Sequence, residues 1–573
     1  MYNVEVAWKL QEIADLLEFK GDNYFKIRAY RNAARVIDNL PESVEELDKS
    51  GKLLEVPGIG KNIAAKIREM METGDFDLHR RLVKEIPPSI LEIMTVRGIG
   101  PKRARLLYRE LNIASLDDLE QAAQKRKIRK LPGFGAKLER DILSHVKGYK
   151  NNVGRFTLGD AYDLSVELVK FLEHLPIVKK VSLGGSLRRW RETVADVDIV
   201  LLTRDNEALK NIVAEHPMVR EVLDTGNSRI EYTTAWRIPV DISFAGEESY
   251  WTDLLWNTGN REHYNKLQNI AREMGLSLDR TGLYKGKVRL DACSEVDIYR
   301  HLGLPYIEPE LREDKGEIEA ALAGTLPVLI ETKDIVGDLH VHTKWSDGIN
   351  SIEDMALKAR EIGYQYIAIT DHSRSLKIAN GLSIKKILKQ FKKIERLNEE
   401  LDGIKILTGT EVDILADGSL DFPDEILERA DLVVASVHSS FSQDRETMTG
   451  RVIAAARNKY VDIIGHPTGR ILIQREPYDI DMERLIEEAS KCGVAIEINS
   501  SPERLDMNDR YARIAAEAGV KVAVNTDAHD FKRLGEMRYG VAVARRAWLT
   551  ADNVINTLNF EELKDYLETH KRG

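Results

Sequence analysis

Histidine and carboxylate side chains recur at the ends of apolar segments in the second half of the chain. The set comprises His340, His342, Asp347, His372, Glu411, His438, His466, Asp527 and His529. A single buried histidine is more often a hydrogen-bonded core residue than a ligand, but this recurrence favours metal binding. Imidazole mixed with carboxylate suits Zn²⁺, Mn²⁺ or Fe²⁺. These nine candidate ligands are more than one ion can coordinate. We therefore expect two or three clustered ions and metal-dependent phosphoester hydrolysis.

A second candidate centre is purely acidic. Asp196 and Asp198 flank Val197, and Asp241 lies inside the apolar segment PVDISF. Residues two apart on a strand share a face, and a neighbouring strand can supply the third acid. Three carboxylates can hold two Mg²⁺ or Mn²⁺ ions, which activate a hydroxyl and neutralise leaving pyrophosphate. A lone Asp-x-Asp is weak evidence, but the ordered set predicts nucleotidyl transfer.

A glycine-rich turn precedes the paired aspartates. It reads Gly184-Gly185-Ser186-Leu187-Arg188-Arg189. Its backbone N–H groups, beginning at Gly185, and the Ser186 hydroxyl can donate to a triphosphate, while Arg189 adds positive charge. The turn therefore predicts a nucleotide site beside the acids.

A related sequence occurs three times in the first 150 residues. The copies are EVPGIGKNIAAKI (55–67), TVRGIGPKRARLL (95–107) and KLPGFGAKLERDI (130–142). Each predicts a helix, a tight turn and a second helix whose free N–H groups can face a phosphate. Such hairpins hold a DNA backbone without reading bases. The turns could instead serve packing alone, but three copies followed by basic residues favour DNA contacts, from Gly58, Gly60, Gly98, Gly100, Lys102, Gly133 and Gly135.

The segments that must position these groups divide the chain. After the helical front, residues 155 to 318 alternate short strands (KKVSLGGS, DVDIVLLT, PVDISFAG) with helices. Charged turns around 310–333 indicate a linker. Beyond it, seven apolar segments follow in order: IVGDLHVH, YIAITDH, IKILTGTEVDI, LVVASVH, VDIIGHP, VAIEINS and VKVAVNTDAH. This alternation with helices predicts a parallel barrel, whose active site lies at the strand C-termini.

Composition restricts the class of protein. The 573 residues are 43% hydrophobic and 31% charged, without an apolar run long enough to span a membrane or an N-terminal signal, so a cytoplasmic protein is expected. Cys293 and Cys492 form no metal or disulfide motif. The net charge is −10, yet Lys and Arg outnumber Asp and Glu by 28 to 23 in residues 1–150. The basic excess coincides with the three repeats.

The first 318 residues resemble family X DNA polymerases. The GGSxRR turn, DVD and VDI match the palm motifs of that family, and Trp256-Asn257-Thr258-Gly259 with Tyr264-Asn265-Lys266 match its thumb. The resemblance implies metal ligation by the three aspartates and nucleotide contacts from Gly185, Ser186, Arg189, Trp256, Gly259 and Asn265. One extra residue lies between the Thr-Gly pair and Asn265. Trp256 and Asn257 replace the usual aromatic pair, which puts the discrimination against ribonucleotides in question.

The N-terminal helices resemble the deoxyribose-phosphate lyase domain of the same family. In that domain a lysine amine forms a Schiff base with an abasic sugar. Lys66 occupies the matching position, with Lys26 and Tyr30 nearby in the pattern. Alternatively, Lys66 is a plain phosphate contact together with Lys61 and Arg68.

Residues 334–570 resemble the PHP (polymerase and histidinol phosphatase) family. The motifs are HVHT with SDG, then TDH, EVD, SVH, GHP and TDAH, and each expected ligand position is intact. The resemblance implies a distorted (β/α)7 barrel that processes DNA 3′ ends as a 3′-5′ exonuclease, a 3′-phosphatase or an abasic-site endonuclease. Lys344 or Arg374 is a candidate contact for a second phosphate.

The combined prediction is a multidomain α and α/β chain. Its parts are a lyase-like helical domain (1–80), fingers with helix-hairpin-helix motifs (81–150), a nucleotidyltransferase-type mixed-sheet palm (151–235), a thumb (236–318), a linker (319–333) and the PHP barrel (334–573). Short-gap filling in base excision repair is the predicted function. Gapped or primed duplex DNA, dNTPs and other repair enzymes are the predicted partners, at the nucleoid and without a membrane.

Two alternatives stay open at this point. In one, the barrel is a small-molecule phosphatase and the front half only tethers it to DNA. In the other, the protein is a DNA-binding scaffold with an inactive polymerase centre. The intact acids at 196, 198 and 241 argue against the scaffold.

Overall fold

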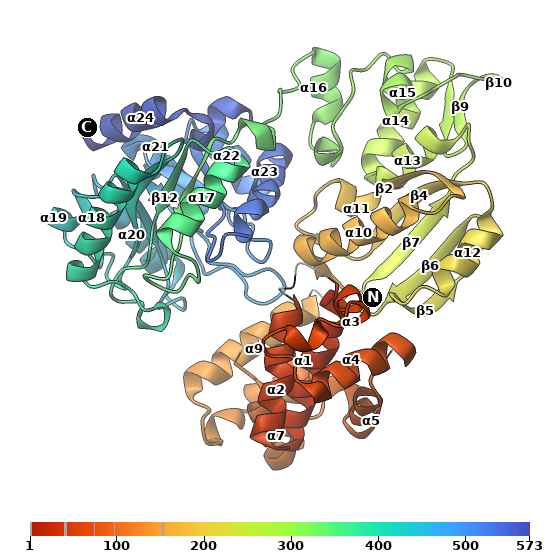
Figure 1. Cartoon of the computed structure of the whole chain (residues 1–573). Helices are drawn as coiled ribbons and strands as arrows, with labels where there is room; N and C mark the ends of the chain where they lie inside the picture. Colours follow the sequence, from red (N-terminus) through yellow and green to blue (C-terminus); the bar gives the residue numbers. More distant parts are fainter. Residues whose placement is uncertain are drawn as a thin grey trace. The chain divides into compact units, whose positions relative to one another are not determined.

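The computed structural model describes residues 3–38, 40, 43–73, 75–96, 98–151 and 154–572 (Figure 1). Two compact units compose it. The first holds Met1–Val153 with Glu215–Met218 and Ile473–Glu476, and the second holds the remainder. Among the described residues, no helix is long and apolar enough to cross a membrane.

The first unit is helical around one hydrophobic core. Leu10, Ile13, Ile67 and Phe76 are fully buried in it. Its α-helices are α1 (Asn3–Lys20), α2 (Tyr24–Asp38), α3 (Val44–Lys49), α4 (Lys61–Thr73), α5 (Asp77–Glu85), α6 (Pro88–Thr95), α7 (Pro101–Leu111), α8 (Leu116–Gln124) and α9 (Ala136–Asn151), with 3₁₀ turns at Leu53–Glu55 and Ile128–Lys130.

The three predicted hairpin turns share one backbone conformation. The first glycine of each has a positive φ, of 100° at Gly58, 83° at Gly98 and 79° at Gly133. A side chain is disfavoured in this region, which explains the glycine. In each copy the next residue donates its N–H to a carbonyl three positions earlier, and α4, α7 or α9 starts shortly after. The helix-hairpin-helix prediction is confirmed.

The second unit begins with a mixed five-stranded sheet. Its order is β2 (Val178–Leu183), β4 (Val197–Thr203), β7 (Pro239–Phe244), β6 (Arg229–Thr234) and β5 (Val219–Asp224). Only β4 and β7 run parallel. The helices α10 (Leu158–Glu173), α11 (Gly185–Arg188) and α12 (Asn206–Ala214) accompany it, as does a pair of short strands, β1 (Phe156–Thr157) and β3 (Thr193–Val194). The predicted boundary at residue 235 cuts this sheet, because β7 pairs with both β4 and β6.

A smaller helical and antiparallel region follows. It contains α13 (Tyr250–Thr258), α14 (Arg261–Glu273), β8 (Ser277–Asp279), β9 (Gly282–Lys285), β10 (Val288–Arg289), α15 (Glu295–His301), the 3₁₀ turn Pro309–Leu311 and α16 (Glu317–Ala323). The predicted linker 319–333 is not a free tether. It includes the end of α16 and the buried residues Leu329 and Ile330. Leu329 packs in the hydrophobic core of the region around α14 and α15.

The last region is a seven-stranded parallel sheet in strict chain order. The strands are β11 (Gly337–Val341), β12 (Tyr366–Ile369), β13 (Lys405–Asp413), β14 (Leu432–Ser436), β15 (Ile463–Ile464), β16 (Ala495–Asn499) and β17 (Val522–Asn525). Val341 and Ala528 form a parallel bridge between the first and last strand ends, and His342 N donates to Ala528 O at 2.9 Å. The sheet is therefore a nearly closed barrel, and the predicted fold class is confirmed.

Helices lie outside the barrel strands (Figure 1); the first six connect successive strands, and the last two follow β17. They are α17 (Ile352–Ile362), α18 (Ile384–Glu400), α19 (Asp424–Leu427), α20 (Arg445–Ala456), α21 (Met482–Cys492), α22 (Asp509–Glu517), α23 (Met537–Arg546) and α24 (Phe560–Arg572), with 3₁₀ turns at Thr332–Asp334, Lys377–Ala379, Arg533–Glu536, Ala551–Asn553 and Ile555–Thr557. The strands are buried on both faces, as a covered parallel sheet requires.

A buried arginine holds the region around α15 together. Arg312 is fully buried, lies 2.7 Å from Glu295 and has its guanidinium over the rings of Tyr299 and Tyr306. We predict that Arg312→Met destabilises the protein by about 3 kcal/mol, because Glu295 loses a buried partner. Urea unfolding and hydrogen exchange of α15 measure this change.

The matched control is Arg300→Met on α15. Arg300 pairs with Asp297, but its side chain is 73% exposed, so no resolvable loss is expected. An equal loss in both variants would contradict the importance of the buried pair.

Candidate metal centre and acidic sheet site

The carboxylate of Glu411 is the centre of the histidine cluster. It lies inside β13, is 1% exposed, and both its oxygens face imidazole nitrogens. The nitrogen–oxygen distances are 2.6 Å to His372, 3.0 Å to His466, 3.3 Å to His438, 3.4 Å to His340 and 3.6 Å to His342. Five side chains from different parts of the barrel thus converge on one carboxylate.

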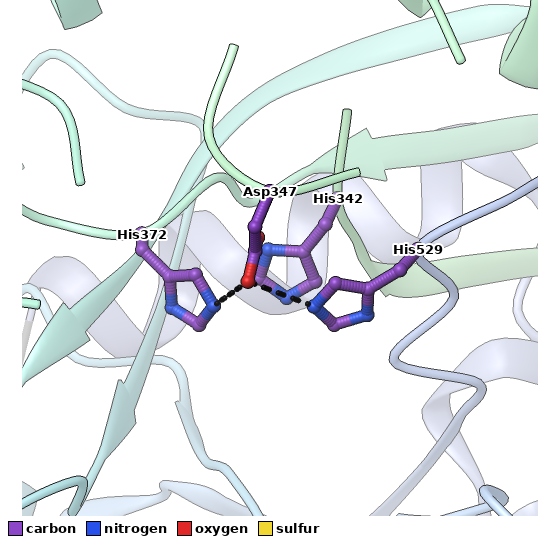
Figure 2. Close-up of side chains that lie close together, drawn as sticks. All are labelled: His342, Asp347, His372 and His529. Carbon is purple, nitrogen blue, oxygen red and sulfur yellow. Dashed lines mark ion pairs between the residues drawn. The ribbon is translucent and has the colours of Figure 1, made fainter. Parts of the chain in front are cut away.

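A second carboxylate organises the neighbouring group. Asp347 lies 3.5 Å from both His372 and His529, and His342 completes the set (Figure 2). The rings of His342 and His372 stack with centroids 4.3 Å apart. Figure 2 shows the imidazole rings arranged around the Asp347 carboxylate.

The ligand atoms form three overlapping groups. In each group they lie within 4.8 Å of one another: His342, Asp347, His372 and His529; His340, His342 and Asp527; and His372, Glu411 and His438. His342 belongs to two groups and so does His372, so the groups are continuous. The structure therefore brings together eight of the predicted ligands, and His466 joins through Glu411.

The barrel topology explains this convergence. His342, His372, His438 and His466 follow β11, β12, β14 and β15 closely, and Asp527 follows β17. Parallel strands direct all their C-termini to one end of a barrel. Residues separated by nearly 190 positions are therefore neighbours, as the 3.1 Å between His342 and Asp527 illustrates.

Burial and charge separate the protonation states within the cluster. Burial, with neighbouring His529 and His372, lowers the pKa of His342 to about 3, so this imidazole is neutral. Burial would raise the pKa of Glu411, but His438, His372 and His340 outweigh it and hold that pKa well below its usual range. The cluster thus contains a carboxylate anion and a neutral imidazole, the forms that coordinate metals.

The acidic site lies on the mixed sheet. Asp198 in β4 is the direct register partner of Asp241 in β7, and Asp196 immediately precedes β4. Burial, reinforced by Asp196 and Asp241, raises the pKa of Asp198 to about 7. Gly185 lies against this carboxylate. A Cβ there would come 1.6 Å from Asp198 Oδ2, and its φ is +58°, so the turn requires glycine.

Sequence reasoning missed one acid in this site. Glu231 on β6 is the register partner of Asp241 and raises the pKa of Asp196, after burial itself. Its signal was an acid in the alternating strand RIEYTT. Arg229 offsets some of this charge at 3.7 Å from Asp241. Among the described residues, the three aspartates do not form a group as tight as those of the barrel.

The predicted nucleotide contacts lie on three elements. Ser186 belongs to α11, Trp256 is 45% exposed on α13, and Asn265 is exposed on α14. Arg189 is 3.0 Å from Glu313 and donates to the carbonyl of Thr258. Its guanidinium also lies against Gly259, where an added Cβ would stand 3.4 Å away. Arg189 and Gly259 are therefore neighbours, and Glu313 holds the guanidinium there.

In the helical unit the predicted groups differ in accessibility. The side chain of Lys66 is paired with Glu69 and is 30% exposed, whereas that of Lys102, 3.8 Å from Glu18, is 82% exposed. The second glycine of each hairpin, at 60, 100 and 135, has no atom within 4 Å of an added Cβ, so the turn surface is open.

Four family models match parts of the chain. They are a helix-hairpin-helix domain at residues 1–76, a SAM-like helix-hairpin-helix tandem at 90–147, a DNA polymerase beta thumb at 253–313 and a PHP domain at 338–501. Their order agrees with the order of the helical unit, the smaller helical and antiparallel region and the barrel.

One relative spans the whole chain. The DNA polymerase/3′-5′ exonuclease PolX of Bacillus subtilis (strain 168) is 37% identical over 99% of this chain and 100% of its own length. The chain belongs to the PolX family. Shorter relatives include a probable phosphatase of Thermoanaerobacter sp. (strain X514), 36% identical over 42% of this chain and 96% of its own, and the probable phosphatase YcdX of Escherichia coli, 29% identical over 39% and 93%.

The barrel of this PolX protein fits divalent metal ions. Nε2 of His340, Nε2 of His342 and Oε2 of Glu411 are buried without a hydrogen-bond partner in the described part of the chain. Leaving such atoms unsatisfied is costly, and a bound cation would satisfy them together. The donor set therefore supports metal binding by the barrel.

Two further carboxylates orient the histidines of the PolX barrel, and sequence reasoning missed both. Glu497 in β16 is fully buried, lies 2.7 Å from His340 Nδ1 and accepts the backbone N–H of His466 at 2.7 Å. Asp413 lies 2.6 Å from His438 Nδ1. Carboxylates behind metal-binding histidines fix the ring orientation. The detectable signals were the acid within VAIEINS and the second acid of EVD.

We predict that Glu411→Gln lowers the metal content of the barrel by at least one ion per chain. The amide removes the charge that several imidazoles face. Elemental analysis after dialysis, with the thermal shift on adding Mn²⁺, measures the loss. Glu425→Gln, on the exposed surface of α19, is the control and should retain the full content. Equal content in both variants would remove Glu411 from the centre.

Proposed function

We propose that this PolX protein fills short gaps during base excision repair and that its barrel trims DNA 3′ ends as a 3′-5′ exonuclease. The observation that carries the proposal is the full-length match to a DNA polymerase/3′-5′ exonuclease. In support, one chain contains an acidic sheet site next to a glycine turn and a histidine-carboxylate centre in a barrel. Trimming would make an end extendable, and the acidic site would extend it.

For the polymerase site we propose that Asp196, Asp198 and Asp241 hold Mg²⁺ or Mn²⁺. The bound ions would activate a primer hydroxyl and neutralise the pyrophosphate. Because Gly185 has no side chain, the turn can lie against Asp198 and would leave room for the triphosphate beside the acids. Arg189, held by Glu313, would add positive charge, and Ser186 would donate a hydrogen bond.

We propose further nucleotide contacts on the neighbouring helices. Trp256 and Asn265 are accessible to the base and sugar of a dNTP, and Gly259 lies beside the Arg189 guanidinium. In this proposal, discrimination against ribonucleotides depends on Trp256 and Asn257.

For the barrel we propose two or three Mn²⁺, Zn²⁺ or Fe²⁺ ions, held by the nine residues predicted from the sequence. Bound ions would supply Lewis acidity for phosphoester hydrolysis. The protein's own contribution would be orientation, because Glu497 and Asp413 fix the rings of His340 and His438. A neutral His342 would present a free lone pair.

We propose gapped or primed duplex DNA as the substrate, held by the three hairpin turns. Their open glycines and the exposed Lys102 support backbone contacts. Lys66 is a candidate lyase nucleophile, but its amine would first have to leave Glu69. Other repair enzymes would supply the gaps, which would place the protein at the nucleoid.

A second candidate function is small-molecule phosphatase activity of the barrel. The observation that favours it is the similarity to probable phosphatases. In that case, the barrel would release phosphate from a small ester and leave a DNA primer intact.

The test is a denaturing gel of a gapped duplex with a labelled primer, in Mn²⁺, with and without dNTPs. Asp198→Ala should abolish extension, with a loss of at least about 100-fold because metal ligation fails. His342→Ala should abolish shortening and leave extension intact. Asp205→Ala and His301→Ala, at exposed positions, are the controls. A wild-type protein that neither extends nor shortens the primer would refute the proposal.

A further inference from the structure

A groove with a volume of about 1180 Å³ lies along α18 of the barrel. One wall is the helix, with Lys386, Lys389 and Lys393 among its lining residues, and the other includes Lys344 and Trp345. These last two belong to the loop between His342 and Asp347, two of the proposed ligands. The groove therefore adjoins the loop that carries the metal centre.

The charge of the helix wall is strongly positive. Lys386, Lys389, Lys393 and Arg396 follow at spacings of three and four residues, which places them along one side of the helix. Lys392 also lines the groove, whose acidic members are Glu353 and Glu395. Within the described residues, the four groove lysines of α18 form no ion pair with an acid. In a chain of net charge −10, such a concentration of unpaired cations favours a polyanion.

A buried side chain next to the basic residues attaches α18 to the metal loop. Gln390 is fully buried and donates a hydrogen bond to Asp371. Asp371 also accepts the backbone N–H of Thr343 at 2.8 Å and the Thr343 hydroxyl at 2.6 Å, and His372 follows it directly. The basic side of the helix is therefore held in register with the residues that carry His342 and His372.

We propose that this groove binds the single-stranded 3′ end of a DNA strand and guides it to the metal centre of the barrel. The lysines would neutralise successive phosphates, and the half-buried Trp345 would stack on a base near the scissile bond. The proposal rests on the proposed exonuclease function and adds to it the path of the substrate. A single strand fits because the cations follow one line along one helix.

The test compares the full-length triple variant Lys386→Ala/Lys389→Ala/Lys393→Ala with a control, Lys405→Ala/Lys459→Ala/Lys564→Ala. The control removes the same charge from exposed positions of the same barrel outside the groove. Two substrates are used with Mn²⁺: a 5′-labelled single-stranded DNA 20-mer and the p-nitrophenyl ester of thymidine 5′-phosphate. Gap filling is measured in parallel.

We expect the groove variant to raise KM for the 20-mer about 10-fold or more. The slope of log KM against log salt concentration should fall by about 2. Each phosphate contact of a single strand contributes about 0.7 to this slope, and the variant removes three lysines. Hydrolysis of the small ester and gap filling should stay at wild-type levels, as should all activities of the control. Trp345→Ala should raise KM for the 20-mer and leave the salt slope unchanged.

Unchanged KM and salt slope for the 20-mer in the groove variant would overturn the inference. Equal loss on the small ester would also overturn it, because the lysines would then only support the metal centre. A wild-type protein that cleaves the ester but no DNA would instead refute the proposed exonuclease.

Discussion

The contact of one buried carboxylate with five imidazoles is the constraint on which the barrel depends. Glu411 would be costly as an isolated buried anion, so it needs the histidines that surround it. The histidines in turn need acids, and Glu497 and Asp413 supply them from the far side. This network extends across most strand ends, so its complete set of contacts requires the strands to converge at one end of the barrel.

The acidic site on the mixed sheet accommodates its clustered carboxylates differently. Its aspartates are half-buried, and burial together with the repulsion of Asp196 and Asp241 raises the pKa of Asp198. They are joined by Glu231 and faced by Arg229, without histidine. A site of oxygen ligands suits Mg²⁺, whereas mixed nitrogen and oxygen ligands suit transition metals. The two centres therefore differ in donor chemistry as well as in fold.

Sequence patterns predicted the main elements well. The seven apolar segments correspond to β11–β17, and the three Gly-x-Gly turns share a backbone conformation, because strand burial and glycine conformation are local properties. Boundaries were less predictable. Pro239–Phe244 joins the mixed sheet through its pairing with two strands, and Ile330 is buried although the sequence predicts a linker there. Neither pairing nor packing is visible in the segment itself.

The sequence by itself determined which residue types were available, in which order, and on which kind of element. It thereby determined the donor groups available in the barrel and at the three aspartates, since imidazole and carboxylate bring their donor atoms wherever they lie. Only the tertiary structure decided that Glu411 faces five histidines, that Glu231 borders Asp241, and that Gln390 fixes a basic helix to the metal loop. These relations join residues far apart in the chain, and their distances follow from strand register and barrel closure.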